Sequence, residues 1–215
     1  MEKEEIAVKV TNVTKDIKKT KVLNNINLTV KKGQAYGIIG RNGSGKSMLF
    51  KAICGLINIT DGEIVVFDKS IKNGNFPDKL GMIIEHPGFL PQYSALKNLQ
   101  ILASINNAID DSKIKETIAL VGLDPNNTLP IKKYSLGMKQ RLGIAQALME
   151  DPKLLVLDEP MNGLDSKGVE EIRKILLNLK SQSVTILLAS HMQDDIDEIC
   201  DHVYNMENGF LTEIK

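Results

Sequence analysis

Residues 36–47 read YGIIGRNGSGKS, a short apolar run that passes directly into a glycine-rich segment ending in Lys46 and Ser47. From Gly40 onward the segment fits the phosphate-binding pattern G-x-x-x-x-G-K-[ST] in full. A helix-type stretch follows at residues 48–54. The glycines let consecutive N–H groups turn toward phosphate oxygens, and the positive end of the following helix favours the same anion. The sequence therefore predicts a strand, a phosphate loop and a helix that bind a nucleoside triphosphate.

The residue types of this loop predict a task for each position. Lys46 supplies a mobile cation for the β- and γ-phosphates, and the Ser47 hydroxyl is a candidate Mg²⁺ ligand. The alternative is a glycine-rich turn with a chance lysine, and the register of strand, glycines, Lys-Ser pair and helix argues against it. The expected nucleotide-binding residues of the loop are Gly40, Asn42, Gly43, Ser44, Gly45, Lys46 and Ser47.

Length and charge limit the class of protein. The chain has 215 residues, enough for one large domain or a domain with a subdomain. Its 27 basic and 27 acidic residues balance, so no overall field favours nucleic acid, and no nucleic-acid partner is expected. The apolar runs are too short to cross a bilayer, and the N-terminus lacks the layout of a signal peptide. Cys54 and Cys200 are expected to be packed thiols. These features indicate a soluble, intracellular protein.

The pattern of apolar residues predicts an α/β fold. The expected strands are residues 6–10, 26–30, 62–67, 80–84, 153–157, 184–189, 203–206 and 210–214. Helical spacing marks residues 94–150 and 167–180. In the first of these segments, one apolar face is expected to contain Leu96, Leu99, Ile101, Leu102 and Ile105. Alternation of strands and helices implies a mostly parallel sheet. We therefore predict one nucleotide-binding domain with a core of residues 1–85 and 151–215, split by a helical insert, residues 86–150.

A second motif ends a buried strand with two acids: residues 154–160 read LLVLDEP. A carboxylate at the C-terminal end of a parallel strand points into the crevice where ligands sit in such sheets. Asp158 is a candidate for holding Mg²⁺, and Glu159 for polarising the water that attacks the γ-phosphate. The alternative is a solvated acidic pair at the start of a loop, which the presence of the phosphate loop disfavours.

A third motif, residues 134–141, reads YSLGMKQR and opens a helix. Ser135 is a natural N-cap, and a helix N-terminus with serine and glycine is a second phosphate site. Two phosphate sites in a chain of this size pose a geometric problem. The problem is resolved if the second site serves a nucleotide held by another copy of the chain.

Together these motifs resemble the ATP-binding subunit of ATP-binding-cassette (ABC) transporters, over nearly the whole chain and in the same order. Residues 135–138 resemble that family's signature motif, and residues 161–165, MNGLD, its D-loop with Asp165. His191 resembles the switch histidine that contacts the γ-phosphate. The resemblance implies a P-loop NTPase (RecA-like) core with a mostly parallel sheet, an N-terminal antiparallel β subdomain and a helical ABC subdomain.

The resemblance also implies how such a chain works. It implies a head-to-tail homodimer or heterodimer in which ATP and Mg²⁺ lie between the phosphate loop of one copy and Ser135 and Gly137 of the other. Hydrolysis separates the copies and moves attached integral membrane permease subunits. The chain would then be cytoplasmic and peripheral on the inner face of the cell membrane, and its docking face would lie around residues 85–94 and the helical insert.

The sequence departs from the family pattern in three places, one of which involves two residues. Ile17 stands where an aromatic residue usually stacks on adenine, so weaker apolar packing is expected there. Leu136 and Met138 replace the usual glycine and glutamine of the signature. Glu85 replaces a glutamine that reaches the Mg²⁺ and senses the membrane partner. A glutamate keeps the oxygen ligand and adds charge, and the alternative is a surface glutamate on a loop.

The loop around Glu85 and the signature resemble one branch of the family, the bacitracin and lantibiotic resistance or immunity exporters. The leading prediction is thus an ATPase that drives export, with a peptide antibiotic as substrate. The alternative within the family is a soluble ABC ATPase that acts on ribosomes, DNA or Fe–S assembly. A P-loop kinase or GTPase is disfavoured, because the guanine-reading motif is absent and the signature helix and His191 would have no role.

Overall fold

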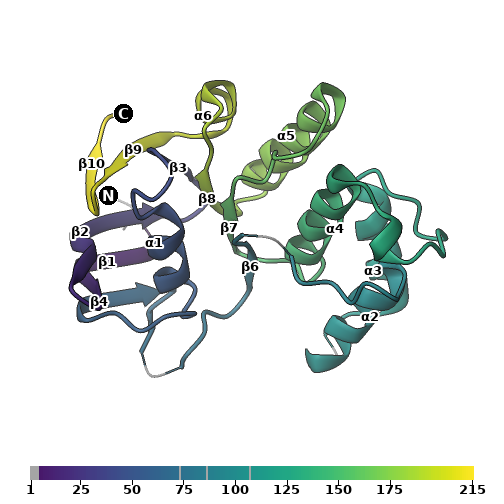
Figure 1. Ribbon diagram of the computed structural model, residues 1–215, viewed down its shortest axis with the longest axis horizontal. Coiled ribbons are helices and arrows are strands. Elements are labelled where there is room, and N and C mark those ends of the chain that lie inside the picture. The colour runs from purple at the N-terminus through teal and green to yellow at the C-terminus, as the bar shows by residue number, and fades with distance from the viewer. Residues whose placement is uncertain (1–4, 73, 86, 107) are drawn as a thin grey trace.

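The computed structural model describes residues 5–72, 74–85, 87–106 and 108–215. Its larger sheet lies at the centre of the molecule (Figure 1). In spatial order this sheet contains β10 (Phe210–Glu213), β9 (His202–Glu207), β3 (Ala35–Ile39), β8 (Thr185–Ala189), β7 (Leu154–Asp158) and β6 (Leu80–Ile83). Neighbouring strands from β9 to β6 run parallel, and β10 pairs antiparallel with β9. The expectation of a mostly parallel sheet is confirmed.

A second, antiparallel sheet forms the N-terminal part of the chain. In spatial order it contains β2 (Thr20–Lys31), β1 (Ile6–Ile17), β4 (Asp61–Val66) and β5 (Lys69–Ser70). The strands β1 and β2 have 12 residues each and are longer than the expected 6–10 and 26–30. Their pairing shifts register several times beyond Val10. A bulge breaks the period-two pattern while the ladder continues, so the sequence pattern ended before the strands did.

The helix α1 (Lys46–Ile53) packs between the two sheets, as its place beside β2 and β4 in Figure 1 indicates. Leu49 and Phe50 of this helix are fully buried among residues of both sheets. Tyr36 of β3 lies in the same core. Burial of this apolar face fixes the start of α1, and hence the phosphate loop, against the central sheet.

Three helices make up the insert: α2 (Ala95–Asn106), α3 (Asp111–Leu120) and α4 (Leu136–Leu148), with a short 3₁₀ helix, η1 (Ile131–Lys133), before α4. They share a core with the opposite face of the central sheet. The buried face of α2 includes Ala95, Leu99 and Ala103. Ile105 is 75% exposed, so its expected place on the buried face is wrong. It follows Ala103 by two residues, which is about 200° around an α-helix.

The C-terminal third adds α5 (Ser166–Ser181) and α6 (Gln193–Ile199), which cover the same face of the central sheet as the insert. The sequence pattern missed α6, because acidic residues fill the helix around Ile196. Both cysteines are free and buried, as expected, and burial raises the pKa of each thiol to about 12.

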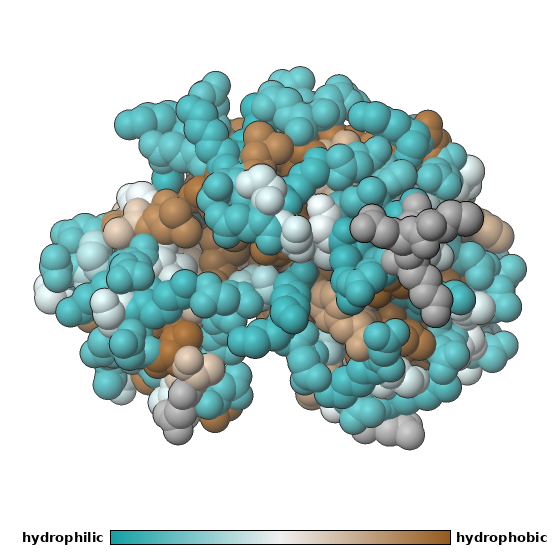
Figure 2. All heavy atoms as spheres, turned by 180° about the vertical axis from the view of Figure 1, so that it is seen from behind, coloured by the Kyte–Doolittle hydropathy of each residue, from teal (hydrophilic) through white to brown (hydrophobic). Residues whose placement is uncertain are grey.

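Hydrophilic side chains cover most of the face seen in Figure 2, and hydrophobic ones show in separate patches. None of the helices in the described ranges combines the length and apolar character needed to cross a bilayer.

Candidate functional site

The phosphate loop connects β3 to α1 and lines a cavity with a volume of about 390 Å³. Two glycines let the chain fold this closely. A side chain on Gly40 would bring its Cβ to 2.2 Å from the carbonyl oxygen of Met206, and one on Gly45 would reach 2.9 Å from that of Val22. Both glycines have positive φ, 147° and 117°. The residues that line the cavity are Val22, Asn42, Gly43, Ser44, Gly45, Lys46, Ser47, Met48, Glu85, Gln140, Asp158, Glu159 and Asn162.

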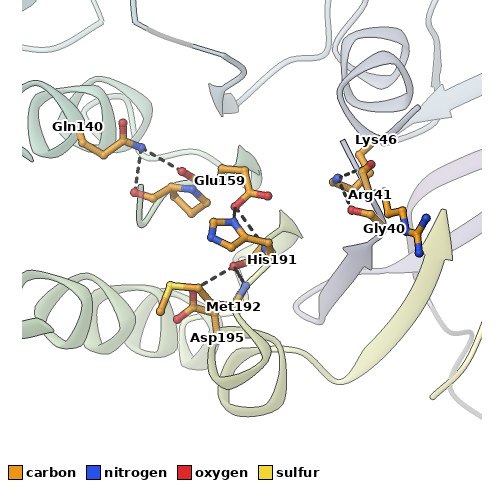
Figure 3. Close-up of polar contacts among 10 residues, drawn as sticks. Gly40, Arg41, Lys46, Gln140, Glu159, His191, Met192 and Asp195 are labelled. Atoms are coloured by element: carbon orange, nitrogen blue, oxygen red, sulfur yellow. Dashed lines mark hydrogen bonds and ion pairs between the residues drawn. The ribbon is translucent and has the colours of Figure 1, made fainter. Parts of the chain in front are cut away.

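The Lys46 side chain folds back over the loop (Figure 3). Its ammonium donates to the carbonyl oxygens of Gly40 at 2.7 Å and Arg41 at 3.3 Å. The side chain is largely buried, yet Lys46 still lines the cavity. A cation removed from bulk water and held by two neutral carbonyls retains its full attraction for an anion. The loop therefore presents a positive charge and the N-terminus of α1 to one space.

Asp158, at the C-terminal end of β7, faces the phosphate loop. Its carboxylate accepts a hydrogen bond from the Ser47 hydroxyl. Burial raises the pKa of Asp158, and the negative charges of Glu159 and Glu85 act in the same direction, while Ser47 and Lys46 oppose the shift. A cation bound next to Asp158 would favour the charged form of this carboxylate.

Glu159 follows in a left-handed backbone conformation, with φ of 52°. Its N–H donates to the carbonyl oxygen of Ala189 at 2.9 Å, which extends the pairing of β7 with β8 by one residue. Its carboxylate oxygen Oε2 lies 2.7 Å from His191 Nδ1 and accepts the His191 N–H at 3.3 Å. The two predicted catalytic residues are thus in direct contact, with 64% of the His191 side chain exposed and 21% of Glu159.

A side chain from the insert holds the backbone of Glu159. The amide nitrogen Nε2 of buried Gln140, on α4, donates to the carbonyl oxygens of Pro160 at 2.9 Å and Glu159 at 3.4 Å (Figure 3).

Glu85, after β6, also has a positive φ of 62°, and its carboxylate pairs with Lys51 of α1 at 2.5 Å. The sequence marks Gln140 only as part of the signature motif, and it carries no signal for the contact with Glu159 or for the pairing of Lys51 with Glu85.

The chemistry of these groups fits a hard divalent cation bound together with a nucleotide. A hydroxyl and carboxylates are the oxygen ligands that Mg²⁺ takes, usually alongside water and substrate phosphates. Ser47 and Asp158 already touch, and Glu85 lines the same cavity. In the part of the chain that the structure describes, no group of three or more His, Cys, Asp or Glu residues is arranged to hold a metal. Ser47, Asp158 and Glu85 offer oxygen atoms of the kind that Mg²⁺ takes.

The signature residues lie outside this cavity. Ser135 caps α4 and accepts the Met138 N–H at 3.2 Å. Gly137 packs so closely on the D-loop that an added Cβ would lie 2.8 Å from the carbonyl oxygen of Gly163. Asp165 caps α5 and accepts the Gly168 N–H at 2.9 Å. Neither Ser135 nor Gly137 reaches the phosphate loop of its own chain.

Ile17 also lies away from the cavity. It ends β1 and is partly exposed, while Val22 of β2 and Met48 of α1 supply apolar surface to the cavity wall. Neither of these two residues was expected at the site, because nothing in the sequence pattern marks them as ligand contacts.

Comparison with known proteins gives a consistent result. Residues 23–162 match the family model described as ABC transporter. The chain is 47% identical over 205 residues to an uncharacterized ABC transporter ATP-binding protein, YybJ, of Bacillus subtilis (strain 168), covering 95% of this chain and 94% of the relative. It is 42% identical over 212 residues to the bacitracin transport ATP-binding protein BcrA of Enterococcus faecalis, with 97% and 69% covered. It is 38% identical over 208 residues to the lantibiotic transport ATP-binding protein SrtF of Streptococcus pyogenes, with 97% and 88% covered.

Solved structures agree with these relatives. A dimeric ATP-binding cassette in a post-hydrolysis state, bound to ADP and Pi, superposes with a TM-score of 0.88 at 26% identity and covers 97% of this chain and 98% of that one. A dimeric bacterial ABC transporter cassette superposes with a TM-score of 0.87 at 25% identity, with the same coverage.

Proposed function

The chain belongs to the ABC transporter family as an ATP-binding subunit and ATPase, and from this premise we propose that it powers export of a peptide antibiotic of the bacitracin or lantibiotic type. The relatives' names favour transport over the alternative, a soluble cassette with a non-transport partner. One observation carries the proposed chemistry: the phosphate loop, Asp158 and Glu159 line a single cavity, and His191 contacts Glu159.

The loop and Lys46 bind the triphosphate. The backbone N–H groups and the α1 N-terminus attract phosphate oxygens, and the Lys46 ammonium exchanges its carbonyl partners for the β- and γ-phosphates. Ser47 and Asp158 would hold Mg²⁺, with Glu85 as a third oxygen donor. The ion supplies charge neutralisation at the phosphates.

Glu159 and His191 act on the attacking water. The Glu159 carboxylate accepts a proton from that water as it approaches the γ-phosphate. His191 holds the carboxylate through its N–H and Nδ1. When both ring nitrogens carry protons, the same ring donates to Glu159 from Nδ1 and to the γ-phosphate from Nε2.

We place the second half of each nucleotide site on another copy of an ATPase chain. Ser135 and Gly137 lie away from the phosphate loop of their own chain, at an exposed helix N-terminus suited to an anion. A head-to-tail dimer brings that terminus of one copy to the loop of the other, with the D-loop and Asp165 beside it. Ile17 does not line the cavity, but it is exposed on the same β1–β2 pair that carries Val22, and we propose it as an outer apolar contact for the adenine.

We assign permease docking to the face near residues 85–94 and the insert, on the cytoplasmic side of the membrane. A groove of about 170 Å³ lies there, with Leu56, Ile84 and Pro87 among its lining residues. Leu90 and Tyr93 expose apolar surface close by in the chain. A groove beside Glu85 that combines apolar side chains with polar surface suits a short amphipathic helix of a membrane subunit.

The Glu159→Gln variant tests the proposed chemistry. Because the amide cannot accept the proton, we expect ATP turnover to fall by about 10²–10⁴-fold with nucleotide binding retained. Size-exclusion chromatography with ATP should then show an accumulated dimer. Glu116→Gln, on α3 away from the cavity, is the control and should behave as wild type. Robust hydrolysis by Glu159→Gln would overturn the assignment.

A separate experiment tests the transport substrate. Deletion of the gene should lower the minimum inhibitory concentration of bacitracin or a lantibiotic, and the wild-type gene should restore it while Glu159→Gln should not. Co-purification from native membranes should identify the permease. Unchanged sensitivity to both antibiotic classes would contradict the substrate and leave the ATPase assignment standing.

A further inference from the structure

The segment after β8 determines how His191 meets Glu159. Both the backbone N–H and the ring Nδ1 of His191 reach the same oxygen, Glu159 Oε2. A contact made partly by the backbone depends on the path of the chain and not only on the side-chain rotamer. Whatever fixes the turn at residues 190–192 therefore fixes the catalytic pair.

Ser190 closes this turn around His191. Its buried hydroxyl accepts the Met192 N–H at 3.1 Å, so a hydrogen bond joins the two residues that flank the histidine. The same hydroxyl donates to Asp195 Oδ2 at 3.1 Å. Figure 3 shows these contacts side by side with the pair of His191 and Glu159.

Asp195 anchors the hydroxyl from α6. Its side chain is fully buried, and its other oxygen, Oδ1, pairs with an Arg173 NH2 group on α5 at 2.8 Å. Arg173 NH1 pairs with the more exposed Glu198 at 2.8 Å. A buried ion pair adds little net stability compared with apolar packing, because both charges lose their hydration. It does impose one geometry, since each oxygen of Asp195 has a defined partner.

We propose that Asp195 is a positioning residue for hydrolysis, acting through Ser190 to hold His191 against Glu159. The chain of contacts runs from Arg173 through Asp195 and Ser190 to the turn that carries the histidine. It ties the orientation of the catalytic pair to the packing of α5 on α6. The inference rests on the proposed role of Glu159 and His191 and adds to it Arg173, Asp195 and Ser190, which are not among the lining residues of the cavity.

Two variants test the chain of contacts. Ser190→Ala removes the hydroxyl, and Asp195→Asn removes the charge and leaves one oxygen that can accept a hydrogen bond. Because a displacement of about 1 Å in a catalytic group can cost about 10²-fold in rate, we expect kcat to fall by roughly 10–100-fold in each variant, with the KM for ATP unchanged. The ¹⁵N chemical shifts of the His191 ring, assigned by their loss in His191→Gln, should move as the contact with Glu159 loosens.

Two further variants serve as matched controls. Ser190→Thr keeps the hydroxyl and should therefore retain a kcat closer to the wild-type value than that of Ser190→Ala. Glu198→Gln removes the charge of the outer partner of Arg173 and should leave both kcat and the His191 shifts unchanged. Thermal unfolding of each variant identifies any loss of rate that comes from loss of fold.

The results separate this inference from the function on which it rests. Wild-type kcat and unshifted His191 signals in folded Ser190→Ala and Asp195→Asn would overturn the positioning role. A fall in kcat of equal size in Glu198→Gln would also overturn it, because the effect would then follow general stability of α6. Active Glu159→Gln would instead remove the proposed function itself.

Discussion

Two carboxylates of the cavity sit on strained backbone. Glu85 and Glu159 follow the neighbouring strands β6 and β7 and have φ of 62° and 52°. Such a conformation costs a residue other than glycine about 1–3 kcal/mol, and it persists where the surroundings hold it. For Glu159 the holding groups are the Ala189 carbonyl and the Gln140 amide. With this backbone conformation, both carboxylates line the cavity that Asp158 also lines.

The Lys51–Glu85 pair allows a prediction about the Mg²⁺ requirement of the ATPase. If Glu85 binds Mg²⁺, its removal in Glu85→Gln should raise the half-saturating Mg²⁺ concentration for ATPase activity. Lys51→Met should lower that concentration, because the Lys51 ammonium competes with the ion for the same carboxylate. Because Glu85 is well exposed, the pair is worth up to about 1 kcal/mol, so each shift in the half-saturating Mg²⁺ concentration should be about fivefold at most.

Magnesium titration of the two variants measures these shifts. The exposed pair of Lys69 and Asp78 offers a control, since it lies away from the cavity, and Lys69→Met should leave the Mg²⁺ requirement as in wild type. An unchanged requirement in Glu85→Gln would show that Glu85 is not a ligand.

N-terminal caps, and hydrogen bonds and ion pairs between elements, set the positions of the helices. Asp110, Ser135 and Asp165 each cap a helix by accepting an N–H three residues on, for α3, α4 and α5. Such a cap is worth about 1 kcal/mol. Asp201, between α6 and β9, accepts the Ala35 N–H at 2.9 Å and pairs with Lys180 at 2.7 Å. One carboxylate thereby joins the start of β3 to the end of α5.

We expect Asp201 to make a pH-dependent contribution to the free energy of unfolding. Burial would raise its pKa, but the Ala35 N–H and Lys180 outweigh burial and hold the pKa below the usual 3.8. Since the folded-state pKa is lowered, the stabilisation is present above about pH 4 and is lost as the pH falls through the lower, folded-state value. Asp201→Asn should therefore lower the free energy of unfolding at pH 7, by less than about 1 kcal/mol because the side chain is partly exposed.

Urea unfolding at pH 7 and at pH values below 3.8 measures this contribution. The difference between wild type and Asp201→Asn should shrink at the lower pH. Asp68→Asn, a substitution at a site with no comparable tie, is the control. A difference that stays constant with pH would contradict a charge-dependent tie.

At the scale of the whole molecule, the proposed head-to-tail dimer would give each chain two halves of different nucleotide sites. The phosphate loop, Asp158 and Glu159 face one cavity, whereas Ser135 begins a helix elsewhere on the surface, followed by Leu136, which is 58% exposed. Gln140 connects the two halves, because the helix that begins at Ser135 also holds the backbone of Glu159. In the proposed dimer, α4 would therefore link the nucleotide site at Ser135 to Glu159 of the other site.

Mixing two inactive variants tests this arrangement. Lys46→Ala lacks a working loop, and Ser135→Ala lacks a working signature. A head-to-tail homodimer of one copy of each has one complete site, so an equal mixture should recover up to about a quarter of the wild-type rate. ATPase assays of the mixture and of each variant alone measure the recovery. No recovery would contradict a composite site formed by two copies of this chain.

The phosphate loop, the acidic strand and the order of strands and helices could be predicted from the sequence, because each rests on local chemistry. Glycines at 40 and 45 permit the turn, and apolar runs such as residues 154–157 bury themselves as strands whatever lies beyond them. The same local patterns gave wrong predictions where the alternation of apolar and polar residues was weak or interrupted. They ended β1 at a bulge, missed the acidic α6, and placed exposed Ile105 in the core.

The contacts that orient the catalytic groups could not be predicted in this way. Gln140 meets Glu159 across 19 residues, and Arg173 meets Asp195 across 22. No periodicity or motif spacing encodes these meetings, because they depend on how α4, α5 and α6 pack on one face of the sheet. Local sequence thus determined which residues are the candidates to bind and cleave a triphosphate, while long-range packing decided how these side chains are oriented and which groups hold them in place.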